Sequence, residues 1–322
     1  MTPPVPDSRP PDPAGRRPLL VILGPTGSGK TDLALCAAQV FDGELVNCDS
    51  LQIYRYLDIG TARTPPAQRR GIPHHLFEFL DPDRVYNAGD YARDARAALA
   101  EISGRGKLPV IVGGTGFYLR ALLDGLFPGP GPDHDLRRRL AAREQTRPGF
   151  LHRLLRRLDT PTAARIHAND RPKLIRAIEV CLLRRSPMSR QFQEGRTGLT
   201  GYRLLKIGLA PPRPELRARL DRRLQDMFSG GLIEEVRRIL ARGFSRNAKS
   251  LQSLGYKEAL AVIEGRMTAD QALAAAQLAT RQYAKRQMTW FRREAGVHWL
   301  ESFGDDPAVQ ANTLAMTRYF GT

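Results

Sequence analysis

The sequence predicts an α/β protein in which a parallel sheet is flanked by helices and interrupted by an all-helical insertion. Short apolar runs alternate with helix-compatible stretches over residues 18–118, an order typical of a helix-covered parallel sheet. A Pro/Gly hinge then introduces an Arg-rich stretch with a helical pattern, and strand-like sequence returns at 202–210. We therefore expect one α/β core at 18–130 and 198–322, with an inserted helical subdomain at 131–197.

The individual elements follow from local patterns. The first expected strand is a short apolar run that breaks into glycine, and the helix after it places Leu33, Ala37 and Val40 on one face. The expected strands cover 18–24, 43–50, 107–118 (with its glycine turn) and 202–210, and the expected helices cover 30–41, 87–107, a stretch from about 118, and most of 136–196 and 213–300.

The composition indicates a cytoplasmic protein that binds a polyanion. Fifty Lys and Arg against 33 Asp and Glu give a net charge of +17, and such a field attracts nucleic acid, although a merely solvated basic surface is the alternative. Cys36, Cys48 and Cys181 form no CxxC pair, so we expect free thiols in a reducing compartment and no zinc site. Residues 1–17 are Pro-rich and are expected to be a disordered leader. No apolar run approaches the ~20 residues of a membrane span.

A glycine-rich turn with a phosphate-binding pattern follows the first expected strand. Residues 24–31 read GPTGSGKT, which matches GxxxxGK(S/T) between a strand and a helix, so the core is expected to be P-loop NTPase-like. Its backbone N–H groups and the helix N-terminus favour phosphate oxygens. Lys30 would add a full charge, and the Thr31 hydroxyl is a candidate ligand for Mg²⁺. The expected diphosphate-binding residues are Gly24, Pro25, Thr26, Gly27, Ser28, Gly29, Lys30 and Thr31.

Asp49 is the one acidic residue at the end of an expected strand. A nucleoside triphosphatase also needs a strand-end acid to hold the water shell of Mg²⁺, yet the strands at 107–118 and 202–210 end without one. In small-molecule kinases, an acid in this place typically faces the acceptor. We therefore expect Asp49 to face the attacking group across the cleft, the alternative being a turn or capping aspartate.

Five ordered motifs closely resemble the tRNA dimethylallyltransferases, also called tRNA isopentenyltransferases. They read GPTGSGKT, NCDSLQIYRYLDIGTAR, GIPHHL, VGGTGFYLRALLDGL and TRQYAKRQMTWFR, and the resemblance spans roughly 19–300. It implies that the P-loop cleft binds dimethylallyl diphosphate. It further implies that the five-carbon group passes, with help from Mg²⁺, to N6 of the adenine 3′ of the anticodon in tRNA, with release of diphosphate.

This chemistry suits the residues of the cleft. Diphosphate becomes a good leaving group once backbone amides, Lys30 and Mg²⁺ neutralise its charge. The exocyclic amine of adenine is a weak nucleophile and needs a base, for which Asp49 is the candidate. The resemblance implies that Arg223 helps to bind the diphosphate. The expected catalytic residues are Asp49, Thr26, Lys30 and Arg223.

The resemblance also implies a set of tRNA contacts. Two segments depart from the family pattern: Pro172-Lys173 stands where Gln-Arg is frequent, which loses the planar guanidinium fork, and Gln252 stands where some relatives have arginine. The expected tRNA-contacting residues are Asp49, Ser50, Leu51, Gln52, Thr115, Arg137, Pro172, Lys173, Leu174, Ile175, Arg176, Gln252, Ser253, Leu254, Gly255, Tyr256, Lys257, Lys285, Arg286, Gln287, Met288, Thr289, Trp290, Phe291 and Arg292.

A base inside a stacked loop must be flipped out to reach such a cleft. We expect Arg281, Lys285 and Arg292 to line one side of a C-terminal helix, with Tyr283, Trp290 and Phe291 interleaved for stacking. Core packing is the alternative for Trp290 and is favoured for Phe291. The Arg-rich insertion is expected to hold the anticodon stem through phosphates. His74 and His75 are expected to form a packed turn, not a metal site.

Two other functions remain open from the sequence. One is a P-loop kinase of a small metabolite that uses ATP, with Asp49 binding the acceptor hydroxyl. The other is a non-catalytic RNA-binding protein with a vestigial loop. The basic insertion argues against the kinase, and the intact Lys30, Thr31 and Asp49 argue against the vestigial loop. We expect a monomeric, non-membrane enzyme whose partners are tRNA and dimethylallyl diphosphate.

Overall fold

The computed structural model describes residues 15–127, 129–191 and 195–321. The expected leader at 1–17 lies largely outside these ranges. The chain divides into two compact units, one running through Leu122 and resuming at Thr200, and the other comprising Leu123–Leu199. Each unit is described by itself.

The first unit is built on a parallel sheet, as the sequence predicts. Its six strands lie in the order β3-β2-β4-β1-β5-β6, and all neighbouring pairs are parallel. The strands are β1 (Arg17–Leu23), β2 (Gly43–Asn47), β3 (His74–His75), β4 (Leu108–Gly113), β5 (Tyr202–Leu209) and β6 (Val297–Leu300).

The centre of the sheet is apolar because it is covered on both faces. Leu20 of β1 lies between Val110 of β4 and Leu205 of β5 in register, and Leu19 to Leu23 are at most 1% exposed. Such continuous apolar runs are typical of buried parallel strands. The sheet therefore provides a rigid base whose carboxyl-terminal edge carries the loops discussed below.

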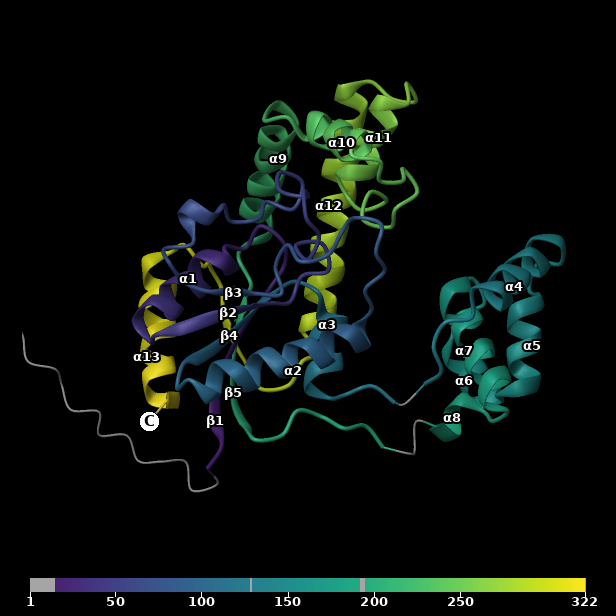
Figure 1. Ribbon diagram of the computed structural model, residues 1–322, viewed down its shortest axis with the longest axis horizontal. Coiled ribbons are helices and arrows are strands. Elements are labelled where there is room, and N and C mark those ends of the chain that lie inside the picture. Colours follow the sequence, from purple (N-terminus) through teal and green to yellow (C-terminus); the bar gives the residue numbers. More distant parts are fainter. Residues whose placement is uncertain (1–14, 128, 192–194, 322) are drawn as a thin grey trace, which may run out of the picture. The chain divides into compact units, whose positions relative to one another are not determined.

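Helices cover the two faces of the sheet (Figure 1). The chain crosses from β1 to β2 through α1 (Lys30–Val40) and returns to β4 through α2 (Ala88–Gly104), so right-handed crossovers place the two helices on opposite faces. The helix α13 (Pro307–Gly321) packs against α1, and α3 (Gly116–Leu123) follows β4. The α2 helix begins at a capping box formed by Asn87 and Asp90.

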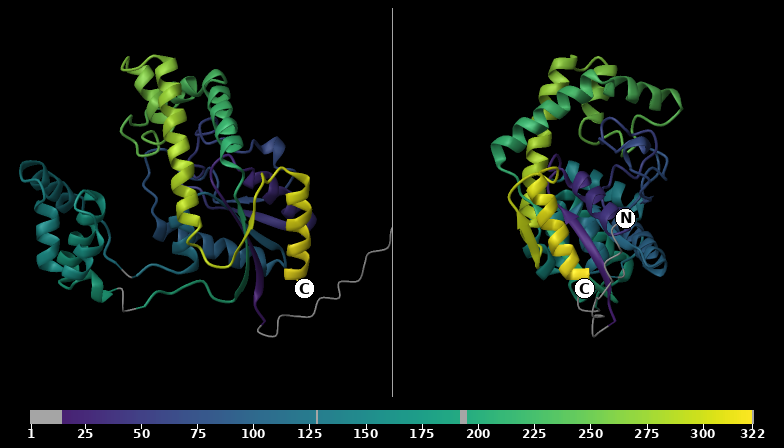
Figure 2. Two further views of the ribbon diagram at one scale, coloured as in Figure 1. Left: turned by 180° about the vertical axis from the view of Figure 1, so that it is seen from behind. Right: turned by 90° about the vertical axis from the view of Figure 1, so that its left-hand side faces the viewer.

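A second helical layer continues the first unit beyond β5. It comprises α9 (Arg213–Ser229), α10 (Leu232–Ala241), α11 (Tyr256–Ile263) and α12 (Ala269–Phe291). The α9 and α12 helices lie side by side (Figure 2). These helices enclose an apolar cluster with the segment after β2, which includes Ile53, Tyr54 and Leu57.

The second unit is a small helical bundle with a core of its own. Its helices are α4 (His134–Thr146), α5 (Phe150–Leu158), α6 (Thr160–Arg165), α7 (Arg171–Arg184) and α8 (Met188–Gln191). Leu151, Leu155, Leu174 and Ile178 are fully buried in it. The expected insertion at 131–197 falls inside this unit.

The structure differs from the expected elements at several strand ends. The β3 and β6 strands were not expected, and a 3-10 helix, η1 (Pro66–Gln68), lies in the loop before β3. The β2 strand ends at Asn47, so Asp49 lies in the loop beyond it, and β4 ends at Gly113. Among the described residues, no helix is long and apolar enough to cross a membrane.

Candidate active site

The P-loop wraps around the N-terminus of α1. Gly24, Gly27 and Gly29 have φ angles of +153°, +77° and +81°, a region that other residues rarely adopt. A Cβ atom at Gly24 would also lie 2.9 Å from the carbonyl oxygen of Leu209. The Lys30 ammonium donates a hydrogen bond to the Pro25 carbonyl at 2.7 Å and so closes the loop on itself.

Gln287 of α12 forms hydrogen bonds that hold this loop in place. The backbone N–H of Thr26 donates to Gln287 Oε1 at 2.8 Å, and Gln287 Nε2 donates to the carbonyl of Gly114 at 2.8 Å. Gln287 is 6% exposed. The expectation that its side chain contacts tRNA is therefore not supported, because both of its polar atoms are used inside the protein to join α12, the P-loop and the end of β4.

The segment after β6 also contacts the P-loop. The N–H of Gly304 donates to the carbonyl of Ser28 at 2.9 Å, and a Cβ atom at Gly29 would lie 2.7 Å from Asp305 Oδ1. Arg219 of α9 donates to both carboxylate oxygens of Asp305, at 2.8 and 3.1 Å. Burial is the main cause that raises the pKa of Asp32 in the first turn of α1, and the nearby Asp305 carboxylate raises it further.

One cavity of about 780 Å³ brings all four predicted catalytic residues together. The P-loop forms one wall, the loop after β2 forms another, and α9 contributes a row of charged side chains. Its polar lining residues include Thr26, Lys30, Thr31, Asp32, Asp49, Gln52, Thr64, Glu215, Arg219, Arg222, Arg223, Asp226 and Gln287. Leu35, Val112 and Phe303 add apolar surface, which suits a ligand with both a charged and an apolar part.

Asp49 both caps a turn and lines this cavity. Its Oδ1 accepts from the N–H groups of Leu51 at 2.8 Å and Gln52 at 3.4 Å, and its own N–H donates to Asn47 Oδ1 at 2.8 Å. Asn47 is 1% exposed and also donates to the Leu76 carbonyl at 2.9 Å. The turn that the alternative reading predicted is therefore present, and it fixes the Asp49 carboxylate at the edge of the cavity.

The charges in the cavity perturb one another. Burial lowers the pKa of Lys30 from 10.5 to about 8, the Asp49 carboxylate opposes this shift, and the Arg223 guanidinium adds to it. Burial also lowers the pKa of Arg223, and again Asp49 opposes the shift. Lys30 and Arg223 are thus two desolvated cations beside a single carboxylate, Asp49. A bound diphosphate would stabilise the charged forms of both cations.

Polar side chains that follow β2 and β4 meet beside Asp49. The N–H of Ser50 donates to Thr115 Oγ1 at 3.0 Å, and the N–H of Thr115 donates to the Cys48 carbonyl at 3.0 Å. Burial is the main cause that raises the pKa of Tyr283 on α12, and the Asp49 carboxylate raises it further. The predicted tRNA-contacting residues Ser50 and Thr115 thus lie next to the predicted base.

The protein offers few ligands for a magnesium ion at this site, which suits an ion that would take most of its ligands from the phosphates of a bound substrate. Among the described residues, no three His, Cys, Asp or Glu side chains are placed to hold a metal ion. Thr31 lines the cavity next to Lys30, so its hydroxyl is available there. Mg²⁺ commonly keeps several waters and takes its other ligands from substrate phosphates, which suits this sparse set.

His74 and His75 form the edge strand β3 and have structural contacts. The Nδ1 atom of His74 lies 2.7 Å from the Ile72 carbonyl, and His75 Nε2 lies 2.6 Å from Glu44 Oε2. The His74 ring also packs on Phe77, with ring centroids 5.0 Å apart. Neither histidine lines the cavity.

The end of α12 presents a basic and aromatic surface. A second cavity, of about 410 Å³, is bordered by Gln282, Lys285, Arg286, Thr289, Trp290 and Arg293. The Arg120 guanidinium lies 4.3 Å from the Trp290 ring centre, and Phe117, which is 52% exposed, lies edge-on to the same ring. Phe291 is 1% exposed and belongs to the core, as the alternative reading predicted. In the segment after β4, the sequence predicts a contact only for Thr115 and gives no signal for Phe117, two residues further along.

The predicted contact segment at 252–257 is divided between surface and core. Gln252 and Lys257 are exposed, and Gln252 Nε2 donates to the Arg246 carbonyl at 2.9 Å. Tyr256 is fully buried, and its hydroxyl donates to Glu235 Oε1 at 2.7 Å. The expectation that the Tyr256 side chain contacts tRNA is therefore not supported.

In the second unit, the predicted arginines are fixed by an internal carboxylate. Arg137 donates from Nε and Nη2 to the two oxygens of Glu179, each at 2.7 Å, and Arg176 donates to Glu179 and to the Pro130 carbonyl. Glu179 is fully buried. Leu174 is fully buried as well, whereas Lys173 pairs with Asp170 and is 72% exposed.

Comparisons with known proteins find relatives over most of the chain. The model of the IPP transferase family matches residues 52–294. The tRNA dimethylallyltransferase of Solibacter usitatus is 57% identical over 297 residues, which cover 92% of this chain and 97% of that protein. That of Koribacter versatilis is 54% identical over 301 residues, covering 93% and 98%.

Solved structures show the same fold. The tRNA isopentenylpyrophosphate transferase of Bacillus halodurans matches with a TM-score of 0.69 and 35% identity, over 95% of both chains. A eukaryotic dimethylallyltransferase acting on tRNA matches with a TM-score of 0.77 and 28% identity, over 94% of this chain and 77% of that one.

Proposed function

Since the chain belongs to the IPP transferase family, we propose that it transfers the dimethylallyl group of dimethylallyl diphosphate to N6 of the adenine 3′ of the anticodon in tRNA. It is a transferase of the prenyltransferase type that acts on tRNA. The observation that carries the proposal is the shared cavity, in which the P-loop, Asp49 and Arg223 face one another across space for a diphosphate and an apolar tail.

The P-loop wall of the cavity suits the diphosphate of the donor. The inward-turned backbone at Gly27 and Gly29, the N-terminus of α1 and the Lys30 ammonium supply positive charge on one side, and Arg223 supplies it on the other. Thr31 would hold a magnesium ion together with the diphosphate oxygens, and the bound ion would neutralise charge that grows on the leaving group. These groups lower the barrier to breaking the bond between the allylic carbon and the diphosphate oxygen.

The opposite wall suits the acceptor. As the bond from adenine N6 to the allylic carbon forms, N6 must lose a proton, and we assign that proton to the Asp49 carboxylate. Asn47 and the turn at Leu51 and Gln52 fix this carboxylate, which limits the motion needed to reach the amine. The bond from the allylic carbon to the diphosphate oxygen breaks no later than the bond to N6 forms, and the diphosphate leaves with the electron pair of the broken bond.

Other surfaces of the protein suit the rest of the tRNA. We assign Lys285, Arg286 and Trp290 at the end of α12 to the anticodon loop, where cations and a stacking ring would hold splayed bases. We assign the Arg-rich second unit, through such exposed groups as Lys173, to the phosphates of the anticodon stem. The free cysteines Cys36, Cys48 and Cys181 suit an enzyme of the reducing cytoplasm.

A label-transfer assay tests the proposal. Purified protein is incubated with Mg²⁺, radiolabelled dimethylallyl diphosphate and unmodified tRNA, and label is counted in gel-purified tRNA. Label in the adenine 3′ of the anticodon supports the proposal. Consumption of ATP with a small metabolite and no label in tRNA would instead identify a kinase, and tRNA binding without transfer would identify a non-catalytic binding protein.

A matched pair of variants ties the label to the site. Asp49→Asn keeps the size of the side chain and an oxygen for the turn but removes the base. Asp226→Asn makes the same change at an acid that also lines the cavity, on α9, with no predicted role in proton removal. The proposal requires loss of transfer in the first variant and substantial transfer in the second.

A further inference from the structure

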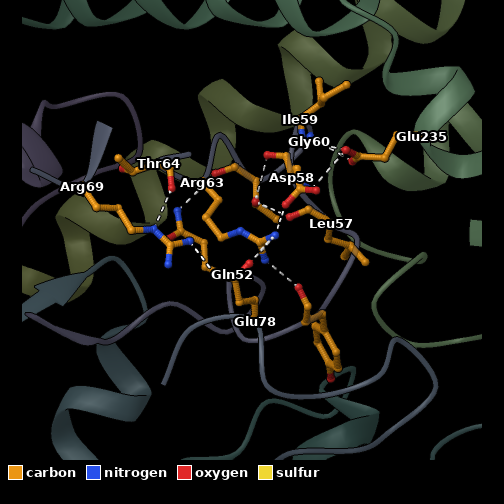
Figure 3. Close-up of polar contacts among 12 residues, drawn as sticks. Gln52, Leu57, Asp58, Ile59, Gly60, Arg63, Thr64, Arg69, Glu78 and Glu235 are labelled. Carbon is orange, nitrogen blue, oxygen red and sulfur yellow. Dashed lines mark hydrogen bonds and ion pairs between the residues drawn. The ribbon is translucent and has the colours of Figure 1, made fainter. Parts of the chain in front are cut away.

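Glu235 of α10 lies outside the cavity, yet it organises the loop that forms one of the cavity walls. Its Oε2 accepts from the backbone N–H groups of Ile59 at 2.8 Å and Asp58 at 3.1 Å (Figure 3). Its Oε1 accepts from the N–H of Gly60 at 3.4 Å. Glu235 is 3% exposed, so its carboxylate depends on these donors for stability.

Tyr256 completes this arrangement. Its hydroxyl donates to Glu235 Oε1 at 2.7 Å, and its ring packs so closely on Gly60 that an added Cβ atom would lie 2.5 Å from it. Tyr256 is fully buried. The side chains of α10 and α11 thus fix both the hydrogen bonds and the depth of the loop at 58–60.

The carbonyl of the next residue connects the loop to side chains that line the cavity. The Thr61 carbonyl accepts from Gln52 Nε2 at 3.2 Å and from Arg223 Nη2 at 3.4 Å. Gln52 and Arg223 both line the cavity. One backbone oxygen therefore contacts two side chains of the site. Thr61 is held by its own hydroxyl, which donates to the Leu57 carbonyl at 2.7 Å, and, through the residues before it, by the hydrogen bonds to Glu235.

A second network, centred on Arg63, holds the side chain of Asp58 and the residues that follow the loop. Arg63 donates to the Tyr54 carbonyl at 3.0 Å and pairs with Asp58 and Glu78, and Arg69 donates to Glu78 at 2.6 Å (Figure 3). Glu235 therefore holds the backbone amides of 58–60, whereas Arg63 holds the Asp58 side chain, and loss of Glu235 would release the amides while the Arg63 contacts remain. The expected effect is a local shift of the Thr61 carbonyl.

We propose that Glu235 is a positioning residue for the transfer reaction, acting with Tyr256 through the Thr61 carbonyl on Arg223 and Gln52. This inference rests on the proposed function, because its effect is on placement of the diphosphate-binding guanidinium. Tyr256 lies in the segment 252–257 expected to contact tRNA, but here its side chain acts on the donor side of the site.

Glu235→Gln is the main test. The amide keeps one acceptor oxygen but turns an NH₂ group toward backbone donors, so the loop loses part of its anchor. We expect the rate of label transfer at saturating substrates to fall about 10- to 100-fold, as for a misplacement of about 1 Å. Binding of inorganic diphosphate by calorimetry should weaken about fivefold, since Arg223 loses its orientation. The dissociation constant for tRNA should stay within about twofold.

Matched controls separate positioning from loss of stability. Glu234→Gln changes the adjacent residue, which is exposed and pairs only on the surface with Arg237, and should leave every readout unchanged. Tyr256→Phe removes one hydrogen bond to Glu235 and should lower the rate less than Glu235→Gln. Tyr86→Phe also removes a tyrosine–carboxylate hydrogen bond, to Asp94 at 2.9 Å, but the acceptor is not the carboxylate that holds the amides of 58–60, so the rate should stay unchanged.

The outcomes distinguish the inference from the function beneath it. A folded Glu235→Gln variant with wild-type rate and diphosphate binding overturns the inference, and so does a variant that loses only tRNA affinity. If Glu235→Gln fails to fold, Tyr256→Phe decides: a lower rate with unchanged tRNA affinity supports positioning, and a wild-type rate overturns it. Absence of label transfer by the wild type would overturn the proposed function instead.

Discussion

Replacing Lys30 by methionine should stabilise the protein while abolishing transfer. Burial lowers the pKa of Lys30 from 10.5 to about 8, so its charge opposes folding by about 3 kcal/mol at ~1.4 kcal/mol per pKa unit. Because Lys30 lines a cavity that water can enter, we take about half of this value. Loss of the hydrogen bond to the Pro25 carbonyl removes roughly 0.5 kcal/mol. The net expectation is a gain of about 1 kcal/mol near neutral pH.

The effect of Lys30 on the free energy of unfolding should depend on pH. From about pH 8 to 10.5 the unfolded chain keeps the Lys30 proton while the folded protein has released it, so the stability of the wild type rises with pH. Lys30→Met lacks this contribution. Its advantage should therefore be largest near neutral pH and should shrink by about 1 kcal/mol by about pH 9.5.

Urea unfolding monitored by tryptophan fluorescence measures the effect in the right part of the protein. Both tryptophans, Trp290 and Trp299, lie in the unit that contains Lys30. Lys257→Met removes an ammonium that is 45% exposed and serves as the control. A Lys30→Met variant that is less stable than the wild type near neutral pH, or an advantage that does not change with pH, would refute the reasoning.

Three further predictions concern the site. Asp49→Asn should lower turnover at least ~100-fold with nearly unchanged tRNA affinity, because a general base is lost; near-normal turnover in a steady-state assay would remove Asp49 from the mechanism. Gln287→Met removes both hydrogen bonds that brace the P-loop. It should therefore raise KM for dimethylallyl diphosphate about tenfold, and an unchanged KM would show that the loop holds its shape unaided. Affinity for tRNA should fall at least ~10-fold between about 50 and 200 mM salt in filter-binding assays, and a flat response would contradict phosphate recognition.

The sequence was sufficient to predict the fold class because the central strands are unusually clear. Residues 18–24 form a continuous apolar run ending in glycine, which matches the buried strand β1 and the start of the P-loop. The strand at 297–300 was missed because its sequence, VHWL, is short and follows a long helical pattern. The edge strand β3 has only two residues and offers no periodicity to detect.

For the site, local motifs indicated what binds, whereas long-range contacts determine how it is held. GPTGSGKT and Asp49 were identifiable because each lies directly after a strand. The roles of Glu235, Asp305 and Gln287 depend on hydrogen bonds and contacts with residues far away in the sequence, such as Ile59, Gly29 and Thr26. Neither spacing nor residue type reveals such pairs, so Gln287 was placed on the tRNA surface and Glu235 was not considered.

The braces on the P-loop have a consequence for biosynthesis. Gln287 and Gly304 both hydrogen-bond to a loop that is made near the beginning of translation. While the ribosome is still adding α12, the nascent chain has the glycine-rich turn but neither of the supports that hold it. The cavity proposed to bind the donor is therefore completed only after α12 and the segment after β6 have been made, so a product truncated before α12 should bind dimethylallyl diphosphate more weakly than the full chain.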